Sequence, residues 1–270
     1  GLVGSEMCIR DSFDIGGTLL TVTNSPALRT AFAQRLKDRL LLYGIRIDTP
    51  AEALGVQLHE NAERYKHWSE ETLVELPQPR IWNEFYLPEY AIGEERLAPI
   101  AEELSFLYDY ERVCNLRRPH LAETMRALSG MGLRLGVISN VISTSFTPHI
   151  LREYGIDGYM EQIVLSSETR CRKPGAEIFR IALERMDLRP EEAAYVGDTI
   201  SRDVLGARNA GLGLMIQIRN PAIAHRDAAF QGGGPAPDHL IDDLYEIPAL
   251  VGACRRQACA AAGDCNRRDA

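Results

Sequence analysis

Short apolar runs alternate with amphipathic segments between residues 112 and 251. Brief apolar runs between turn signals are typical of buried strands, whereas apolar positions three and four residues apart indicate helices. The predicted strands cover residues 133–138, 162–165, 193–196, 214–218 and 238–241. The predicted helices cover residues 120–131, 143–154, 174–186, 200–210 and 243–251. Strands that alternate with helices in this way indicate an α/β fold with a parallel sheet and right-handed crossovers.

A further strand is expected to end at Asp14, but its pattern is unusual. A central parallel strand is buried on both faces and should be nearly continuously apolar, whereas Arg10 and Asp11 lie just before Phe13. Because burying these charges would be costly, the sequence predicts a short or irregular first strand. Residues 1–12 resemble a non-native leader, and residues 252–270 are expected to form a disordered tail.

Residues 25–111 show helical patterns and no convincing strand. Ser25 is a candidate N-cap with Pro26 at the first helical position. The predicted helices cover residues 27–43, 50–68, 82–90 and 94–108. Aromatic residues are concentrated here, which favours the core of a small helical domain over a substrate-facing wall, although different side chains could serve each role. We therefore expect a helical domain, residues 25–111, inserted into a discontinuous core, residues 13–24 and 112–251.

Composition narrows the class of protein. With 270 residues and 45% hydrophobic content, the chain can bury one sizeable core and a second, smaller one. A net charge of −8 argues against nucleic acid or an anionic membrane as the main partner. No apolar run approaches the roughly eighteen residues of a membrane span, and no secretory pattern is evident. The six cysteines are scattered, which favours reduced thiols in a cytoplasmic protein. A monomer or a homodimer is expected, and the sequence does not distinguish between them.

Four short polar segments lie at or near predicted strand ends. They are residues 14–18 (Asp-Ile-Gly-Gly-Thr), 138–140 (Ile-Ser-Asn), 172–174 (Arg-Lys-Pro) and 197–203, which contains Asp198 and Asp203. Ligands of parallel sheets bind at the carboxyl ends of strands, so these segments are expected to meet. Each residue alone could be a turn or helix-capping residue. Their occurrence together and in this order favours a common site.

Such a site suits phosphoryl transfer. A carboxylate at Asp14 can attack phosphorus and form an acyl-phosphate, which divides one difficult displacement into two steps. Lys173 offers a positive charge to the phosphoryl oxygens. The catalytic candidates are therefore Asp14 and Lys173. The candidate phosphate-binding residues are Gly17, Thr18, Ser139, Asn140 and Lys173.

The acidic residues predict a magnesium site. Mg²⁺ prefers a few carboxylates together with water and substrate phosphate. Asp14 and Asp198 could supply the carboxylates, and the main-chain carbonyl of Gly16 could supply a third ligand. Asp203 lies on the following helix, where it could bind the metal through water or pair with Lys173.

With these motifs in order, the chain resembles the haloacid dehalogenase superfamily, in the branch with a helical cap inserted after the first strand. FDIGGTLL is similar to the first family motif, VISN to the second, RKPGAEIF to the third and YVGDTISRD to the fourth. The match covers about residues 13–251. The resemblance implies a Rossmann-like core, a mostly helical cap, a bound Mg²⁺ and an aspartyl-phosphate intermediate at Asp14. It also implies that the substrate is a small phosphorylated metabolite.

The sequence departs from this pattern at Gly16. Phosphatases of the family carry an aspartate there, which protonates the leaving group and then activates water; general acid–base help of this kind is worth about 10²–10⁴-fold. Three interpretations stay open. The chain could hydrolyse phosphate esters slowly or with good leaving groups, or it could bind a phosphorylated metabolite without turnover. It could also cleave phosphonates, but that reaction needs a cap lysine, and only Lys37 and Lys66 are available, without motif support.

Overall fold

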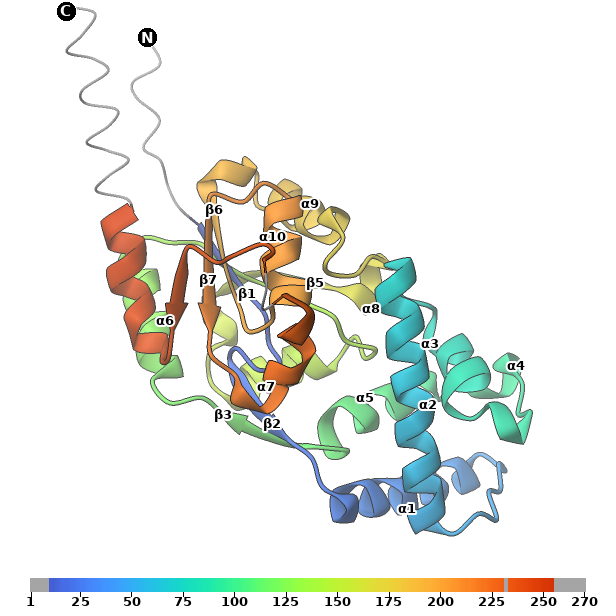
Figure 1. The fold of residues 1–270 in the computed structure, drawn as a ribbon. Helices are drawn as coiled ribbons and strands as arrows, with labels where there is room; N and C mark the ends of the chain where they lie inside the picture. The colour runs from blue at the N-terminus through green and yellow to red at the C-terminus, as the bar shows by residue number, and fades with distance from the viewer. Residues whose placement is uncertain (1–9, 231–232, 255–270) are drawn as a thin grey trace, which may run out of the picture.

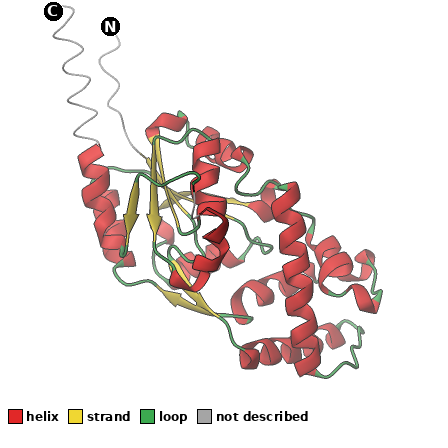
Figure 2. Cartoon of the chain, in the orientation of Figure 1, coloured by secondary structure: helices red, strands yellow, loops and turns green. Residues whose placement is uncertain are grey.

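The computed structural model describes residues 10–230 and 233–254, and its core is a six-stranded parallel sheet (Figures 1 and 2). The strand order is β5-β4-β1-β6-β7-β8, with all pairs parallel. The strands are β1 (Arg10–Phe13), β4 (Leu135–Ser139), β5 (Met160–Leu165), β6 (Ala193–Gly197), β7 (Leu214–Ile218) and β8 (His239–Ile241). The predicted α/β class and parallel sheet are confirmed.

Helices cover both faces of this sheet. They include α6 (Leu121–Gly130), α7 (Phe146–Glu153), α8 (Ser166–Thr169), α9 (Ala176–Arg185) and α10 (Leu205–Asn209). One buried cluster joins Phe13 and Val196 to α6 and α7, and the other joins Tyr195 and Met215 to α9 and α10. The helix expected over residues 200–210 begins as a π-helical turn, η5 (Ile200–Val204). Residues 247–254 are helical, so the helix reaches beyond the predicted start of the tail at residue 252.

The first strand is short, as predicted, with four residues described. Its start is nevertheless earlier than the expected core boundary at residue 13. Arg10 and Asp11 belong to β1, where Arg10 is in register with Ala193 and Asp11 with Leu135. Ala193 and Leu135 are the first residues of β6 and β4. The two charged residues therefore join the amino-terminal end of the sheet, although β1 is one of its central strands. Residues 1–9 and 255–270, which contain most of the expected leader and tail, lie outside the described residues.

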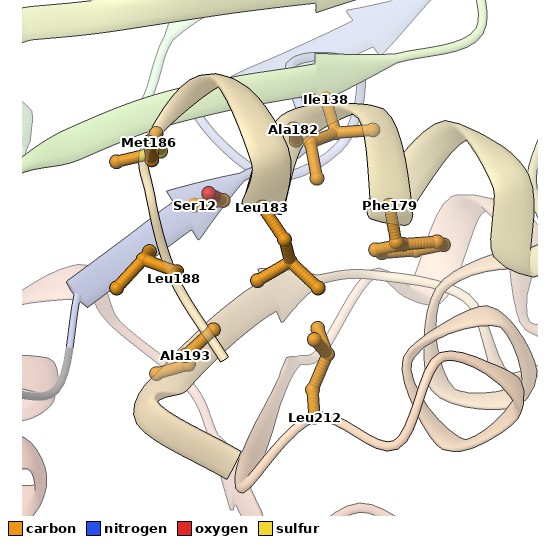
Figure 3. Close-up of a pocket in the computed structure, with 10 residues that line it drawn as sticks. Ser12, Ile138, Phe179, Ala182, Leu183, Met186, Leu188, Ala193 and Leu212 are labelled. Carbon is orange, nitrogen blue, oxygen red and sulfur yellow. The ribbon is translucent and has the colours of Figure 1, made fainter. Parts of the chain in front are cut away.

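A small cavity lies beside β1 (Figure 3). Its volume is about 10 Å³, and Ser12 is the one polar residue among apolar neighbours that include Ile138, Phe179 and Leu183. This is close to the space of a single water molecule, which would need two or more polar partners to be stable there. Gly136 on β4 does not line this cavity: a Cβ there would already lie 3.3 Å from Met186 Sδ and 3.4 Å from Ser12 Oγ. The centre of the sheet is therefore underpacked at this point.

We predict that Ser12→Val stabilises the fold by about 1 kcal/mol, because it adds buried apolar volume where the strand already has space. Ser12→Thr has the same shape but retains the hydroxyl, so it should give a smaller gain. Urea unfolding of the three proteins measures the difference. A loss of stability in Ser12→Val would show that the cavity cannot accept the added methyl group.

Two strands that the sequence analysis missed connect the core to the cap. β2 (Leu20–Thr23) and β3 (Cys114–Arg117) form a separate antiparallel pair, directly before and after the inserted helices. They are short, mostly half-buried or exposed, and partly polar, so they lack the apolar run by which the core strands are recognised. The chain thus enters and leaves the cap through neighbouring strands.

The cap is built from two long helices that pack against each other (Figure 1) and several short ones. Its helices are α1 (Pro26–Leu42), α2 (Ala51–Thr72), α3 (Gln78–Arg80), η1 (Ile81–Tyr86), η2 (Pro88–Tyr90), α4 (Glu94–Leu97) and α5 (Ala101–Glu111). The Ser25 hydroxyl accepts a hydrogen bond from Leu28 N at 3.2 Å, which confirms the predicted N-cap. The aromatic side chains Tyr65, Trp82 and Tyr86 are buried in the cap's own core. None of the described helices combines the length and hydrophobicity that crossing a bilayer requires.

Helix α5 of the cap binds the loop that follows β4. The Glu102 carboxylate accepts hydrogen bonds from the hydroxyls of Ser143 (2.7 Å) and Ser145 (2.6 Å) and from Thr144 N (3.1 Å). Asp109, which is half-buried and about two turns further along α5, accepts a hydrogen bond from Ser143 N at 2.9 Å. Burial raises the pKa of Asp109 to about 7, an effect that the Ser143 amide and Arg112 offset only in part.

Because of this raised pKa, we predict that the free energy of unfolding depends on pH through Asp109. In an unfolded chain the aspartate pKa is about 3.9. As the pH rises from 4 to 7, the unfolded chain loses a proton that the folded chain keeps, so folding becomes less favourable. Asp109→Asn cannot ionise and can still accept the Ser143 hydrogen bond. We expect it to be about 1–2 kcal/mol more stable than the parent chain at pH 8 and nearly equal to it at pH 4. Urea unfolding at both pH values, with the exposed Asp157→Asn as control, tests this; a difference that does not change with pH would contradict it.

Candidate active site

Asp14 lies at the carboxyl end of β1, where residues from three other segments meet it. Its main-chain N–H donates to Val196 O at 2.9 Å, which holds the residue between β1 and β6. The side chain is 8% exposed. Its Oδ1 accepts hydrogen bonds from the Ser139 hydroxyl (3.1 Å) and the Lys173 ammonium (2.9 Å). Among the described residues nothing bonds to Oδ2, so one carboxylate oxygen stays available for chemistry.

Lys173 connects Asp14 to the fourth motif. Its Nζ lies 2.7 Å from Asp203 Oδ1 and 2.8 Å from the Tyr195 hydroxyl, and the side chain is 2% exposed. The Tyr195 hydroxyl in turn donates to Ile138 O at 3.1 Å. Burial and the nearby carboxylates Asp203 and Asp14 raise the pKa of Tyr195, so it stays protonated. The sequence analysis missed Tyr195 because its position on β6 is indistinguishable from that of any buried strand residue.

Asp203 organises the loop that carries Asp198. Its Oδ2 accepts hydrogen bonds from Asp198 N (3.2 Å), Thr199 N (3.0 Å) and the Thr199 hydroxyl (2.6 Å). Burial opposes the charge on Asp203, but Lys173 and Arg202 outweigh it and lower the pKa of Asp203 to about 2. Both oxygens of Asp203 are thus occupied, which favours pairing with Lys173 over direct contact with a metal.

Asp198 has an unsatisfied buried oxygen. Its Oδ2 accepts a hydrogen bond from the Asn220 side chain at 2.7 Å, whereas Oδ1 is buried without a partner. Burial, together with the charges of Asp203 and Asp14, raises the pKa of Asp198 to about 7. One oxygen from each of these three aspartates lies within 4.8 Å of the others. A cluster of like charges with an unpaired buried oxygen fits a divalent cation with oxygen ligands.

The two glycines after Asp14 differ in their surroundings. Gly17 has a φ of +84°, and a Cβ there would overlap the Asp198 carboxylate and lie 2.7 Å from Asn220 Nδ2. The Gly17 carbonyl accepts a hydrogen bond from Arg118 Nε at 3.0 Å, which fixes the loop. Gly16 is exposed, and a Cβ there would meet no atom within 4 Å. The space where the family's acid–base aspartate would project is therefore open.

Two predicted phosphate-binding residues, Asn140 and Thr18, differ in their hydrogen-bond partners. Asn140 Oδ1 accepts a hydrogen bond from Lys173 N and its Nδ2 donates to Lys173 O, each at 3.0 Å, so the Asn140 side chain positions Lys173. Thr18 is fully buried, and its hydroxyl bonds to no other residue in the described part of the chain.

A buried hydrogen-bond network from the cap supports the third motif, residues 172–174. The sequence analysis did not predict this network. Glu75, 1% exposed, pairs with Arg172 and accepts hydrogen bonds from the hydroxyls of Tyr65 and Ser166. The main chains also meet, since Glu75 N donates to Arg170 O at 3.0 Å. Because Arg172 precedes Lys173, the cap helps to place the ammonium group that contacts Asp14.

Comparison with known proteins assigns the family. A model of the haloacid dehalogenase-like hydrolases matches residues 12–211. The chain belongs to the haloacid dehalogenase-like hydrolases. Membership confirms the resemblance that the four motifs predicted, and with it the fold and the hydrolase class.

Relatives of this haloacid dehalogenase-like hydrolase include named enzymes. A glyceraldehyde 3-phosphate phosphatase of Methanothermobacter thermautotrophicus is 30% identical over 165 residues, 61% of this chain and 72% of that protein. A protein of the same name from Methanocaldococcus jannaschii is 35% identical, but the match spans 49% of this chain and only 55% of that protein. The solved structure of a haloacid dehalogenase phosphatase from Thermococcus onnurineus is similar with a TM-score of 0.58 and 23% identity, covering 90% of this chain and 98% of that one. At this identity the structural likeness shows the fold alone.

Within this haloacid dehalogenase-like hydrolase, the paired glycines predict unequal effects of alanine. Gly17→Ala would force a Cβ into the Asp198 carboxylate at a positive φ, so we expect it to destabilise the fold by about 2 kcal/mol or more. Gly16→Ala places its Cβ in open space and should change stability by less than about 0.5 kcal/mol. Thermal unfolding of both variants measures the contrast. Equal effects would show that the loop at Asp198 has more room than the geometry indicates.

Proposed function

We propose that the chain is a magnesium-dependent phosphatase that acts on a small phosphorylated metabolite, with Asp14 as its nucleophile. The observation that carries this proposal is the unbonded Oδ2 of Asp14 beside the Ser139 hydroxyl and the Lys173 ammonium. Relatives named as glyceraldehyde 3-phosphate phosphatases support the substrate class. We expect the protein to act in the cytoplasm.

In the proposed reaction, Asp14 Oδ2 attacks phosphorus while the bond from phosphorus to the ester oxygen breaks. The leaving alkoxide takes a proton from solvent water, and the phosphoryl group stays on Asp14 as an acyl-phosphate. Water then attacks phosphorus, which releases inorganic phosphate and regenerates the carboxylate. Ser139 donates a hydrogen bond and Lys173 a positive charge to the phosphoryl oxygens. Gly17 lets the main chain approach the same oxygens.

The metal site of the proposal uses residues that fit Mg²⁺. Asp14, Asp198 and the Gly16 carbonyl would hold the ion, and Asp203 would support it by fixing the Asp198 loop. When bound, Mg²⁺ supplies positive charge that neutralises the phosphoryl oxygens and the clustered aspartates. The unpartnered Asp198 Oδ1 is the atom that most needs such a ligand.

No side chain at residue 16 can transfer protons. We propose that the chain favours esters whose leaving groups need little protonation. The phosphonate-cleaving alternative is disfavoured by the positions of the cap lysines: Lys37 Nζ bonds to Thr49 O and Lys66 Nζ pairs with Glu63 at 2.9 Å. Each cap amine is thus already held by another group, and neither bonds to Asp14. A phosphate-binding protein without turnover remains the second candidate, because the Gly16 departure affects proton transfer but not binding.

Release of phosphate from p-nitrophenyl phosphate, with and without Mg²⁺, tests the phosphatase proposal. Asp14→Asn should lower the rate by roughly 10³-fold or more, because it removes the nucleophile. Gly16→Asp has open space for its side chain and should raise the rate within the range of about 10²–10⁴-fold expected for an acid–base group.

The exposed Asp157→Asn serves as the control for a general effect of losing a carboxylate. Equal rates for the parent chain and Asp14→Asn would rule out the enzyme proposal. Absence of turnover together with phosphate binding that Asp14→Asn weakens would instead support the binding protein.

A further inference from the structure

Two arginines beside the aspartate cluster have side chains that bond to none of the described residues. Arg202 lies in η5, one residue before Asp203, and Arg226 lies in the 3₁₀ segment η6 (Pro221–Phe230). Both side chains are half-buried, and the Nε atom of each is buried without a hydrogen-bond partner. Within residues 10–230 and 233–254, no ion pair or hydrogen bond involves either guanidinium group. Arginines this close to carboxylates are normally paired, so the absence of any partner calls for an explanation.

The segment that carries Arg226 is held against the site at both ends. At one end, Asn220 donates to Asp198 Oδ2 at 2.7 Å. At the other, the Asp227 carboxylate accepts hydrogen bonds from Ile200 N (2.9 Å) and Ser201 N (3.1 Å) at the start of η5. In Figure 1 this orange segment lies between β7 and the cap helix α2. Arg226 is thus placed by anchored neighbours rather than by a contact of its own.

The charges that act on the two guanidinium groups indicate that both lie near the aspartate cluster. Arg202 interacts with the charges of Asp203, Asp198 and Asp14, and Arg226 with those of Arg202 and Asp198. The two guanidinium groups are therefore close enough to repel each other, and they border the same site. A shared anion would relieve that repulsion and satisfy both groups.

The cap also presents two carboxylates to this region, on α2. Glu63 is already paired with Lys66 at 2.9 Å, and Glu70 lies near both arginines without coming within bonding distance of either. If the arginines served only to bind the cap, Glu70 would be expected to pair with one of them. The unpaired arrangement favours a ligand between the core and the cap instead.

We propose that Arg202 and Arg226 form a second anion subsite, and that the substrate carries a carboxylate or a second phosphate besides the phosphoryl group that reacts at Asp14. This inference rests on the proposed function, because it names the substrate class of the same site. The arginines bind the non-reacting end of the substrate and so select for molecules with two anionic ends. A phosphate ester with a neutral or cationic tail lacks the group that the two arginines bind.

The test uses three inert ligands of similar length, each titrated with Mg²⁺ present by calorimetry: propylphosphonate, 3-phosphonopropionate and propane-1,3-bisphosphonate. The parent chain should bind at least one of the doubly anionic ligands about tenfold or more tightly than propylphosphonate. Which one binds more tightly identifies the second anion as a carboxylate or a phosphate. Arg202→Gln and Arg226→Gln should each reduce this preference by about tenfold, while Arg185→Gln, an exposed arginine on α9, should retain it.

Two results would overturn the inference: equal affinity of the parent chain for all three ligands, or a preference that survives in both glutamine variants. Because the readout is binding, it separates the two proposals. Turnover of p-nitrophenyl phosphate without a preference for double anions would leave the phosphatase standing and remove the subsite. A preference that depends on both arginines, in a chain without turnover, would leave the subsite standing and remove the phosphatase.

Discussion

The buried ammonium group of Lys173 is the interaction on which the site depends. It lies between Asp14 and Asp203, with the Tyr195 hydroxyl as its third partner. Without it, two buried carboxylates would repel each other in a poorly screened environment. Two sets of contacts fix its position. The Asn140 side chain bonds to the main chain of Lys173, and the neighbouring Arg172 pairs with Glu75 of the cap. Through Asp203, the same ammonium group indirectly fixes the loop that carries Asp198.

The core could be predicted from the sequence because buried parallel strands are continuous apolar runs and their ends carry recognisable polar motifs. The motif residues Asp14, Ser139, Lys173, Asp198 and Asp203 were identified in this way, and the structure brings them together. β2 and β3 were not predicted, because each has only four residues, mostly half-buried or exposed, and so lacks a recognisable apolar run. The roles of the motif residues toward a ligand remain predictions, since geometry alone does not test them.

Other parts of the site could not be predicted, because they depend on contacts between distant segments. Tyr195 is an ordinary strand residue until β4 and Lys173 are placed next to it. Glu75 lies in a loop of the cap, almost one hundred residues before its partner Arg172, and has no local signature. Arg226 lies in a segment without any motif. Hydrogen bonds of Asn220 and Asp227 hold that segment near the aspartates. Composition and periodicity report local structure and burial, but they do not report which polar residues become neighbours.

Gly16 shows what the fold does and does not require. Gly17 is required by its positive φ and by the nearby Asp198 carboxylate. The φ of Gly16 lies outside the left-handed region, and a Cβ there would meet no atom within 4 Å. No steric barrier therefore separates this chain from one with an aspartate at that position, and some glycine codons become aspartate codons through a single base change. Packing does not explain why the glycine is present. An aspartate at this position would change the proton transfer available to the site and leave the packing of the loop nearly unchanged.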